Sequence, residues 1–71
     1  MIKIGQMRCW NHIDMESYNP NFKVEKYFVV IGIDDKNERI KVKYLVKGNT
    51  LSHSDHMIML NSSIIGSIGI D

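Results

Sequence analysis

The stretch that decides the fold is Tyr27-Phe28-Val29-Val30-Ile31-Gly32-Ile33, which is followed after five residues by Arg39-Ile40-Lys41-Val42-Lys43-Tyr44-Leu45-Val46-Lys47. The first segment is β-branched and aromatic, and it is too short for a typical helix, so it predicts a buried strand. The second segment alternates apolar and basic residues, which indicates a strand with one buried face. The polar residues 34–38 between the two segments predict a turn. We therefore expect an antiparallel hairpin.

The residues that follow predict the rest of a β-meander. Val46 continues the apolar alternation of the preceding strand, so its side chain should point inward. Gly48-Asn49 is typical of a tight type II′ turn, and 50–53 should form another strand after it. Ser54-Asp55 can cap a helix, because a short side-chain oxygen accepts from free backbone N–H groups. We expect one helical turn over 55–60, a turn at 61–63 and a last, short strand over 64–70.

The N-terminal part predicts one more strand and a long connection. We expect a strand over 5–10, with Met7 and Cys9 on the face opposite to Arg8 and Trp10. The polar residues 11–24 contain Pro20, which breaks helices and central strands, so they should form a long loop.

These elements predict one all-β domain spanning residues 1–71. Five short strands cannot bury their apolar residues in a flat sheet of this size, so the sheet should curl into a small barrel. A strand, a long loop, a three-stranded meander, one helical turn and a final strand form the layout of a five-stranded SH3-like barrel. The rival OB-fold places a helix between its third and fourth strands, and no segment here suits that helix.

The chain also resembles a known family. The segments Ile4-Gly5-Gln6-Met7, Tyr27-Phe28-Val29-Val30-Ile31-Gly32, Lys41-Val42-Lys43-Tyr44-Leu45 and Asn61-Ser62-Ser63-Ile64 are similar in pattern to YorP-type proteins, small prophage-encoded SH3-like barrels. The resemblance covers essentially the whole chain. It implies the fold and a phage origin, and because the family's function is uncharacterised it implies no site residues.

Composition narrows the class of protein. The chain has 71 residues and a net charge of +1, which excludes a strongly basic nucleic-acid wrapper and an acidic disordered tail. A single cysteine, Cys9, cannot form an internal disulfide, and this favours a reducing compartment. No segment reads as a secretory leader or a membrane span. We expect a cytoplasmic protein of a bacterial host, without a membrane partner.

The function that we expect first is a non-enzymatic protein-interaction module. Its partner would be a host or phage protein, and the chain itself would be a monomer rather than an oligomer. Apolar residues crowd the C-terminal third, and neighbours on one short element cannot all face inward. The candidate interface residues are Trp10, Tyr18, Met57, Met59 and Ile68.

The alternative function is weak nucleic-acid binding. The segment 39–47 carries a charge of +4, so the remaining residues carry −3 in total. Clustered cations on one strand face are what phosphate recognition requires, although lysines are also common on a solvated outer face. The candidate residues are Arg39, Lys41, Lys43 and Lys47.

Metal binding and catalysis are weaker hypotheses than protein or nucleic-acid binding. Cys9-x-x-His12 and His53-x-x-His56 have spacings close to those of structural zinc sites, but one thiolate is a poor ligand set. Ser54-Asp55-His56 contains the residue types of a catalytic triad, but triads are assembled by the fold rather than by adjacency. We therefore expect no catalytic residue, no bound metal and no cofactor.

Overall fold

The structure, a computed structural model, describes residues 2–11 and 26–67. These residues form one antiparallel sheet of five strands, in the order β4-β3-β2-β1-β5, and one short helix. The elements are β1 (Gln6–Trp10), β2 (Tyr27–Asp34), β3 (Arg39–Tyr44), β4 (Thr50–Ser54), α1 (Asp55–Asn61) and β5 (Ser62–Ser67). The protein is therefore mostly β, as the sequence predicts. Apart from Asn11, the long loop expected at 11–24 lies outside the described residues.

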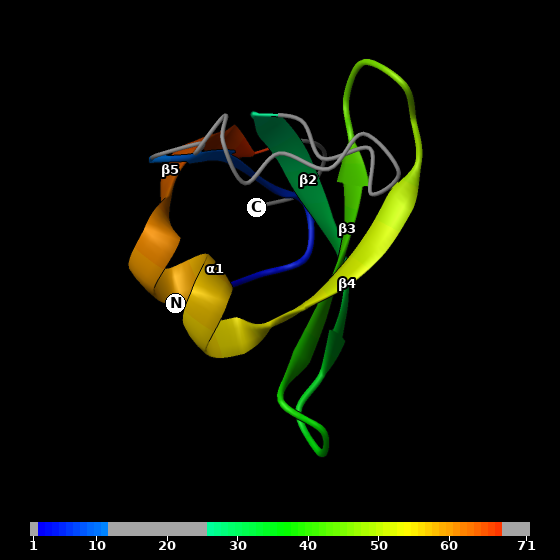
Figure 1. The fold of residues 1–71 in the computed structure, drawn as a ribbon, viewed down its shortest axis with the longest axis vertical. Coiled ribbons are helices and arrows are strands. Elements are labelled where there is room, and N and C mark those ends of the chain that lie inside the picture. The colour runs from blue at the N-terminus through cyan, green and yellow to red at the C-terminus, as the bar shows by residue number, and fades with distance from the viewer. Residues whose placement is uncertain (1, 12–25, 68–71) are drawn as a thin grey trace, which may run out of the picture.

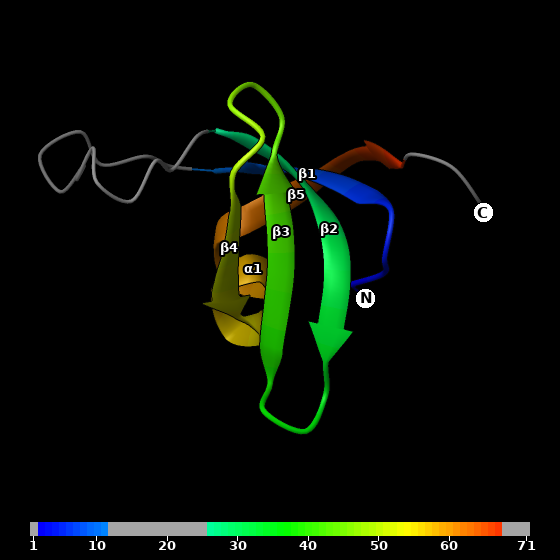
Figure 2. The ribbon, with the colours of Figure 1, turned by 90° about the vertical axis from the view of Figure 1, so that its right-hand side faces the viewer.

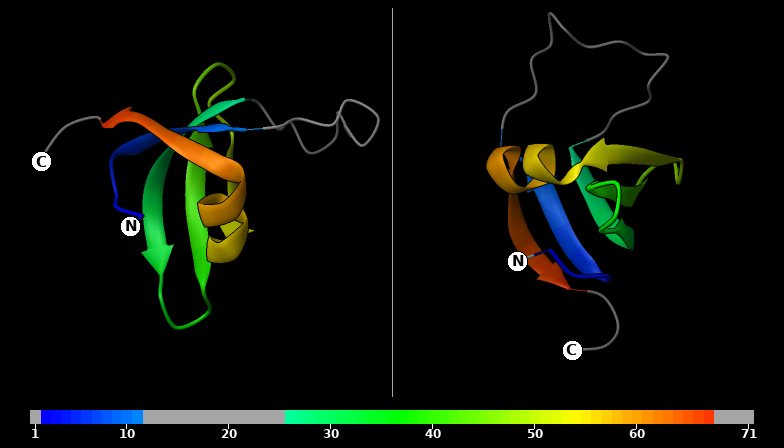
Figure 3. Two further views of the ribbon diagram at one scale, coloured as in Figure 1. Left: turned by 90° about the vertical axis from the view of Figure 1, so that its left-hand side faces the viewer. Right: turned by 90° about the horizontal axis from the view of Figure 1, so that it is seen from below.

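The sheet is strongly bent. The pairing of β2 with β3 shifts between Val30 and Gly32, and that of β1 with β5 shifts at Met7/Arg8. Such bulges increase the local twist and bend a strand. As a result β1 and β5 cross the β2–β3–β4 part steeply, and α1 connects the two edge strands β4 and β5 (Figures 1 and 3). The result is a small barrel-like fold.

The core comes mainly from the stretch that predicted the hairpin. In β3 the side chains of Ile40, Val42 and Tyr44 are buried and those of the three intervening basic residues are exposed. In β1 the side chains of Gln6, Arg8 and Trp10 point inward, as the predicted alternation requires. The buried cluster consists of Trp10, Phe28, Val30, Ile40, Val42, Tyr44 and Ile58. Burial of an apolar side chain of this size stabilises the fold by about 1.5–3 kcal/mol, so these residues dominate folding.

The turn between β3 and β4 differs from the prediction. β3 ends at Tyr44. The N–H of Tyr44 donates to the carbonyl of Asn49 at 2.9 Å, and the carbonyl of Tyr44 accepts from the N–H of Gly48 at 3.0 Å. The turn therefore spans residues 45–48 instead of the two residues expected. Gly48 has a φ of 77°, a conformation that glycine adopts without steric strain. Val46, expected inside the barrel, is 84% exposed on this turn.

The C-terminal elements agree with the prediction in kind but differ in their bounds. Ser54 caps α1, because its hydroxyl accepts from the N–H of Met57 at 3.1 Å. The turn expected at 61–63 is absent from the described structure, since β5 starts at Ser62 directly after the helix. The strand expected over 64–70 ends at Ser67, and the residues beyond it lie outside the described part.

Candidate binding surfaces

The outer face of the sheet carries a row of cations. Arg39, Lys41 and Lys43 are exposed at alternate positions of β3. On the β4 side each cation has a hydroxyl residue opposite it in the register, namely Ser54, Ser52 and Thr50 in that order. Figure 2 shows that α1 lies on the far side of β3, so this face is separate from the helix. Lys47 was predicted to extend the row, but it lies in the turn after β3 rather than on the strand.

A hollow opens at one end of this row. It has a volume of about 530 Å³ and is lined by Gly32, Ile33, Asp34, Asn37, Arg39, Lys41 and Ser52. Gly32 lies opposite Lys41 in the register and has no side chain to fill the space. A glycine on the strand next to the basic row is the sequence signal that could have suggested the hollow.

A second surface is apolar and lies on α1 and the start of β5. We use the name α1–β5 surface for the exposed apolar residues of these two elements, namely Met57, Met59, Leu60, Ile64 and Ile65; Ile64 and Ile65 are neighbours on β5, so their side chains point to opposite faces of the strand. Only Ile58 of the helix points into the core, whereas Met59 and Leu60 are 58% and 75% exposed. The predicted interface residues Met57 and Met59 are thus exposed. Leu60, Ile64 and Ile65 were recognised in the sequence as apolar, but a pattern without an assigned face could not identify them as exposed.

A buried arginine fixes the helix that carries this surface. Arg8 is 5% exposed, and its Nε donates to the Ser62 hydroxyl at 2.7 Å. Its Nη2 donates to the carbonyls of Ser62 and Ile58 at 3.1 and 3.4 Å, and its Nη1 donates to Gln6 Oε1 at 2.6 Å. Burial lowers the pKa of Arg8, but a guanidinium remains protonated in proteins. A cation from β1 therefore satisfies carbonyls at the C-terminal end of α1, where positive charge is favoured.

Trp10 is a core residue, so its assignment to an exposed interface is corrected. The centre of its ring lies 4.8 Å from that of Phe28 and 5.3 Å from that of His53, which it meets edge-on. Its Nε1 donates to the Tyr44 hydroxyl at 3.3 Å, and that hydroxyl lies 2.9 Å from His53 Nε2. Burial lowers the pKa of His53, and the positive charge of Arg39 lowers it further. The alternation that places Trp10 beside Arg8 on one face could have assigned it to the core.

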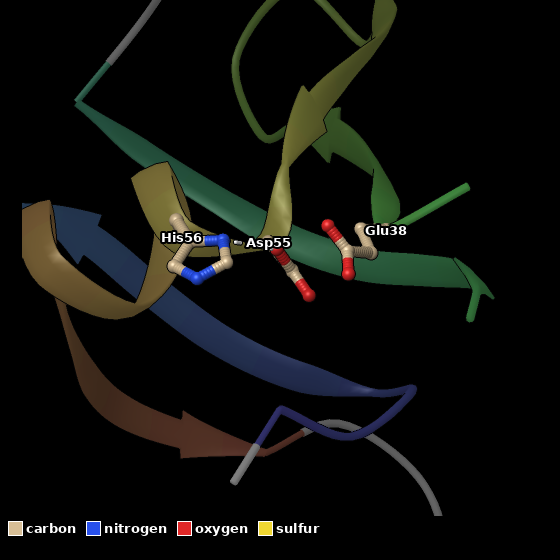
Figure 4. A group of neighbouring side chains, drawn as sticks. All are labelled: Glu38, Asp55 and His56. Atoms are coloured by element: carbon tan, nitrogen blue, oxygen red, sulfur yellow. Dashed lines mark ion pairs between the residues drawn. The ribbon is translucent and has the colours of Figure 1, made fainter. Parts of the chain in front are cut away.

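The zinc site considered in the sequence is not present among the described residues. His53 points into the core toward Tyr44, whereas His56 lies on α1 with its Nδ1 2.9 Å from Asp55 Oδ1. Within residues 2–11 and 26–67, the group that could hold a metal ion consists of Glu38, Asp55 and His56, whose ligand atoms lie within 4.8 Å of one another (Figure 4). Neither Cys9 nor His53 belongs to it, and His12 lies outside the described part.

The sequence could not place Glu38 in this group. Glu38 is distant in the chain and has a φ of 55° at the end of the β2–β3 turn. Its carbonyl accepts from the N–H of Asp55 at 3.0 Å, which brings the two carboxylates together. Exposed carboxylates and an imidazole can ligate divalent cations, but such groups are also common on ordinary surfaces.

The triad-like residues Ser54-Asp55-His56 have other roles. The Ser54 hydroxyl caps α1, and Asp55 lies in the first helical turn, where negative charge is favoured. The side chain of His56 is 75% exposed. The contacts of these residues are therefore those of a helix start.

Two of the predicted interface residues cannot be placed. Tyr18 and Ile68 lie outside the described residues. Within the described ranges, no helix has the length and apolar character needed to cross a membrane. Comparison with known protein families, with characterised proteins and with solved structures gives no match to this chain.

Proposed function

We propose that this chain is an SH3-like barrel that acts as a non-enzymatic protein-interaction module and docks a partner protein through the α1–β5 surface. The observation that carries the proposal is the exposed side of α1. A surface helix normally turns charged residues toward water, but here Met57, Met59 and Leu60 occupy that side.

The SH3-like assignment is supported by the order of the elements. The sheet order β4-β3-β2-β1-β5, with β1 paired to β5 and a single short helix between β4 and β5, agrees with the layout expected from the sequence. The long connection between β1 and β2 fits the same layout.

The chemistry of the α1–β5 surface suits a protein partner. Five of the eleven exposed large apolar residues in the described part of the chain lie within residues 57–65, and three of these five belong to the single short helix. Methionine adapts its shape to different surfaces and is common where proteins bind partners. Residues 57–67 contain no Asp, Glu, Lys or Arg, so the contact should be apolar and insensitive to salt.

The setting of the interaction belongs to the same proposal. We place the protein in the cytoplasm of a bacterial host, with a host or phage protein as its partner. The free thiol of Cys9 and the resemblance to prophage proteins support this setting. The non-enzymatic role is supported by the helix-capping contact of Ser54.

The proposal can be tested by quantitative affinity capture from host lysate with the immobilised protein. Leu60→Asp should remove the specific partner, because it places a charge in an apolar contact, and raising the salt concentration should not release the wild-type complex. Val46→Asp is the matched control, since Val46 is also an exposed apolar residue but lies on the β3–β4 turn. Equal loss for both variants would contradict docking through α1.

Sedimentation equilibrium distinguishes a foreign partner from a second copy of the chain. We expect the free protein to sediment as a monomer. A dimer that Leu60→Asp dissociates would show that the α1–β5 surface is covered by another copy, and it would overturn the proposal of a host or phage partner.

A further inference from the structure

We infer a second binding site on the opposite side of the molecule: the outer face of β2, β3 and β4 binds single-stranded nucleic acid, with the base of one nucleotide in the hollow over Gly32. This goes beyond the protein docking proposed above and uses none of the residues of the α1–β5 surface.

The cations of this face are arranged for a phosphate backbone. Arg39, Lys41 and Lys43 lie at alternate positions of one strand, so the Cα atoms of neighbouring cations are about 6.6 Å apart along it. The side chains of Ser52 and Thr50 flank Lys41 and Lys43 on β4 and add hydroxyl groups. Lysine, arginine and hydroxyl side chains are the usual partners of phosphate oxygens.

Arg39 is held in place before any ligand arrives. Its Nε donates to the Ser52 hydroxyl at 3.1 Å and its Nη2 donates to the Ser52 carbonyl at 2.8 Å. These two bonds use one edge of the guanidinium, and within the described residues Nη1 makes no hydrogen bond. A fixed side chain loses little conformational entropy when it binds, so Arg39 presents its remaining donors at the rim of the hollow.

The hollow offers more than a phosphate needs. It has a volume of about 530 Å³, and its lining combines the apolar surface of Gly32 and Ile33 with charged side chains at the rim. Its floor is the backbone at Gly32, where the β2 bulge and the missing side chain leave the strand open to approach. A base can lie over this floor while its phosphate reaches Lys41.

The residues at the two ends of this outer face determine the direction in which a bound nucleic-acid strand would run. Asp34 and Asn37 close one end of the hollow, where the Asn37 amide donates to the Asp34 carboxylate at 2.8 Å and lowers the pKa of Asp34. This negative charge repels a phosphate and directs the backbone toward Lys43. Beyond Lys43 lies the exposed ring of Tyr27, with the Lys26 ammonium 5.6 Å from its centre. Aromatic rings next to cations are stacking platforms for bases.

A single strand suits this arrangement better than a duplex. A base enters a hollow only when it is unpaired, and paired bases are stacked inside a helix. Tyr27 and Gly32 are five residues apart on β2, which corresponds to about 17 Å and to a few nucleotides.

The test is fluorescence anisotropy of a labelled single-stranded DNA 12-mer of mixed sequence, titrated with the full chain at low salt. We expect binding that weakens about 20-fold when salt rises from about 50 to about 200 mM, as three phosphate contacts predict. Lys41→Glu should weaken binding about tenfold or more. Gly32→Val should weaken it about fivefold or more by filling the hollow, since one stacked base contributes at least that much.

Two features keep the result interpretable. Gly32→Val preserves every charge, and its Cβ would lie 3.4 Å from Lys41 Cβ, which is an ordinary van der Waals contact. Lys3→Glu makes the same charge change as Lys41→Glu at an exposed position before β1, outside β2, β3 and β4. It should leave the affinity within about twofold if local contacts dominate. Urea unfolding followed by Trp10 fluorescence confirms that each variant is folded.

Three results would overturn the inference. The first is no binding of the 12-mer at low salt, and the second is an equal effect of Lys3→Glu and Lys41→Glu. The third is tighter binding of the matching duplex than of the single strand. None of these results bears on protein docking through α1, so the two proposals fail independently.

Discussion

Replacement of Arg8 by methionine should destabilise the protein strongly and should release the helix that carries the α1–β5 surface. Methionine keeps most of the length of the side chain but removes four hydrogen bonds from the guanidinium. The Ser62 carbonyl and Gln6 Oε1 are then left without this donor inside the barrel.

The magnitude follows from these contacts. A hydrogen bond to a charged group contributes about 1.5–3 kcal/mol net, and an unsatisfied buried acceptor costs about 1–3 kcal/mol. Removal of the large desolvation cost of a buried cation offsets part of this loss. We expect Arg8→Met to lower the free energy of unfolding by about 3 kcal/mol, out of about 4–10 kcal/mol for a domain of this length.

Urea unfolding provides the assay, because Trp10 is the only tryptophan and is 5% exposed in the core. Arg8→Lys should lose less than Arg8→Met, since an ammonium retains the charge but cannot make the same forked contacts. A double-mutant cycle with Ser62→Ala should give a coupling energy of about 1 kcal/mol or more. An Arg8→Met protein as stable as the wild type would refute the reasoning, because it would show that the buried charge contributes nothing net to stability.

Further predictions concern the core histidine, the helix cap and one turn. The pKa of His53 is lower in the folded protein than its unfolded value of about 6.5. The free energy of unfolding should therefore fall as the pH drops below about 6.5 and should level off below the folded pKa. His53→Gln should remove this pH dependence, which urea unfolding across this pH range would show. Ser54→Ala should lower the free energy of unfolding by about 1 kcal/mol and Ser54→Gly by only a few tenths, because glycine is tolerated at a cap. Gly48→Ala should cost about 1 kcal/mol at its φ of 77°, whereas Gly66→Ala, whose added Cβ would meet no atom within 4 Å, should be nearly neutral by the same assay.

Local pattern predicted most of the fold. The alternation in 39–44, the apolar run from Tyr27 and the cap at Ser54 depend on interactions between near neighbours, and all three are present in the structure. The exact end of β3 did not follow from the pattern, because Val46 continues the alternation although the chain turns after Tyr44. The turn is set by backbone bonds to Gly48 and Asn49, and these depend on how the two strands meet.

The candidate sites were less predictable because they depend on contacts between distant residues. The cations of β3 could be assigned to one face from their spacing alone. The hollow over Gly32 arises from a bulge and from the contact of Arg39 with Ser52 on the next strand. Trp10 was misassigned because its position beside the long loop outweighed its place in the alternation of β1. Nothing in the local sequence showed that Arg8, rather than an apolar residue, holds the end of α1.

The most direct test of docking through α1 is site-specific photocrosslinking in the bacterial host. A photoreactive amino acid replaces Leu60 in one variant and Val46 in another, and adducts are identified by mass spectrometry. Docking through the α1–β5 surface predicts a discrete adduct with one other protein from position 60 and none from position 46. No adduct from position 60, or the same adducts from both positions, would contradict it.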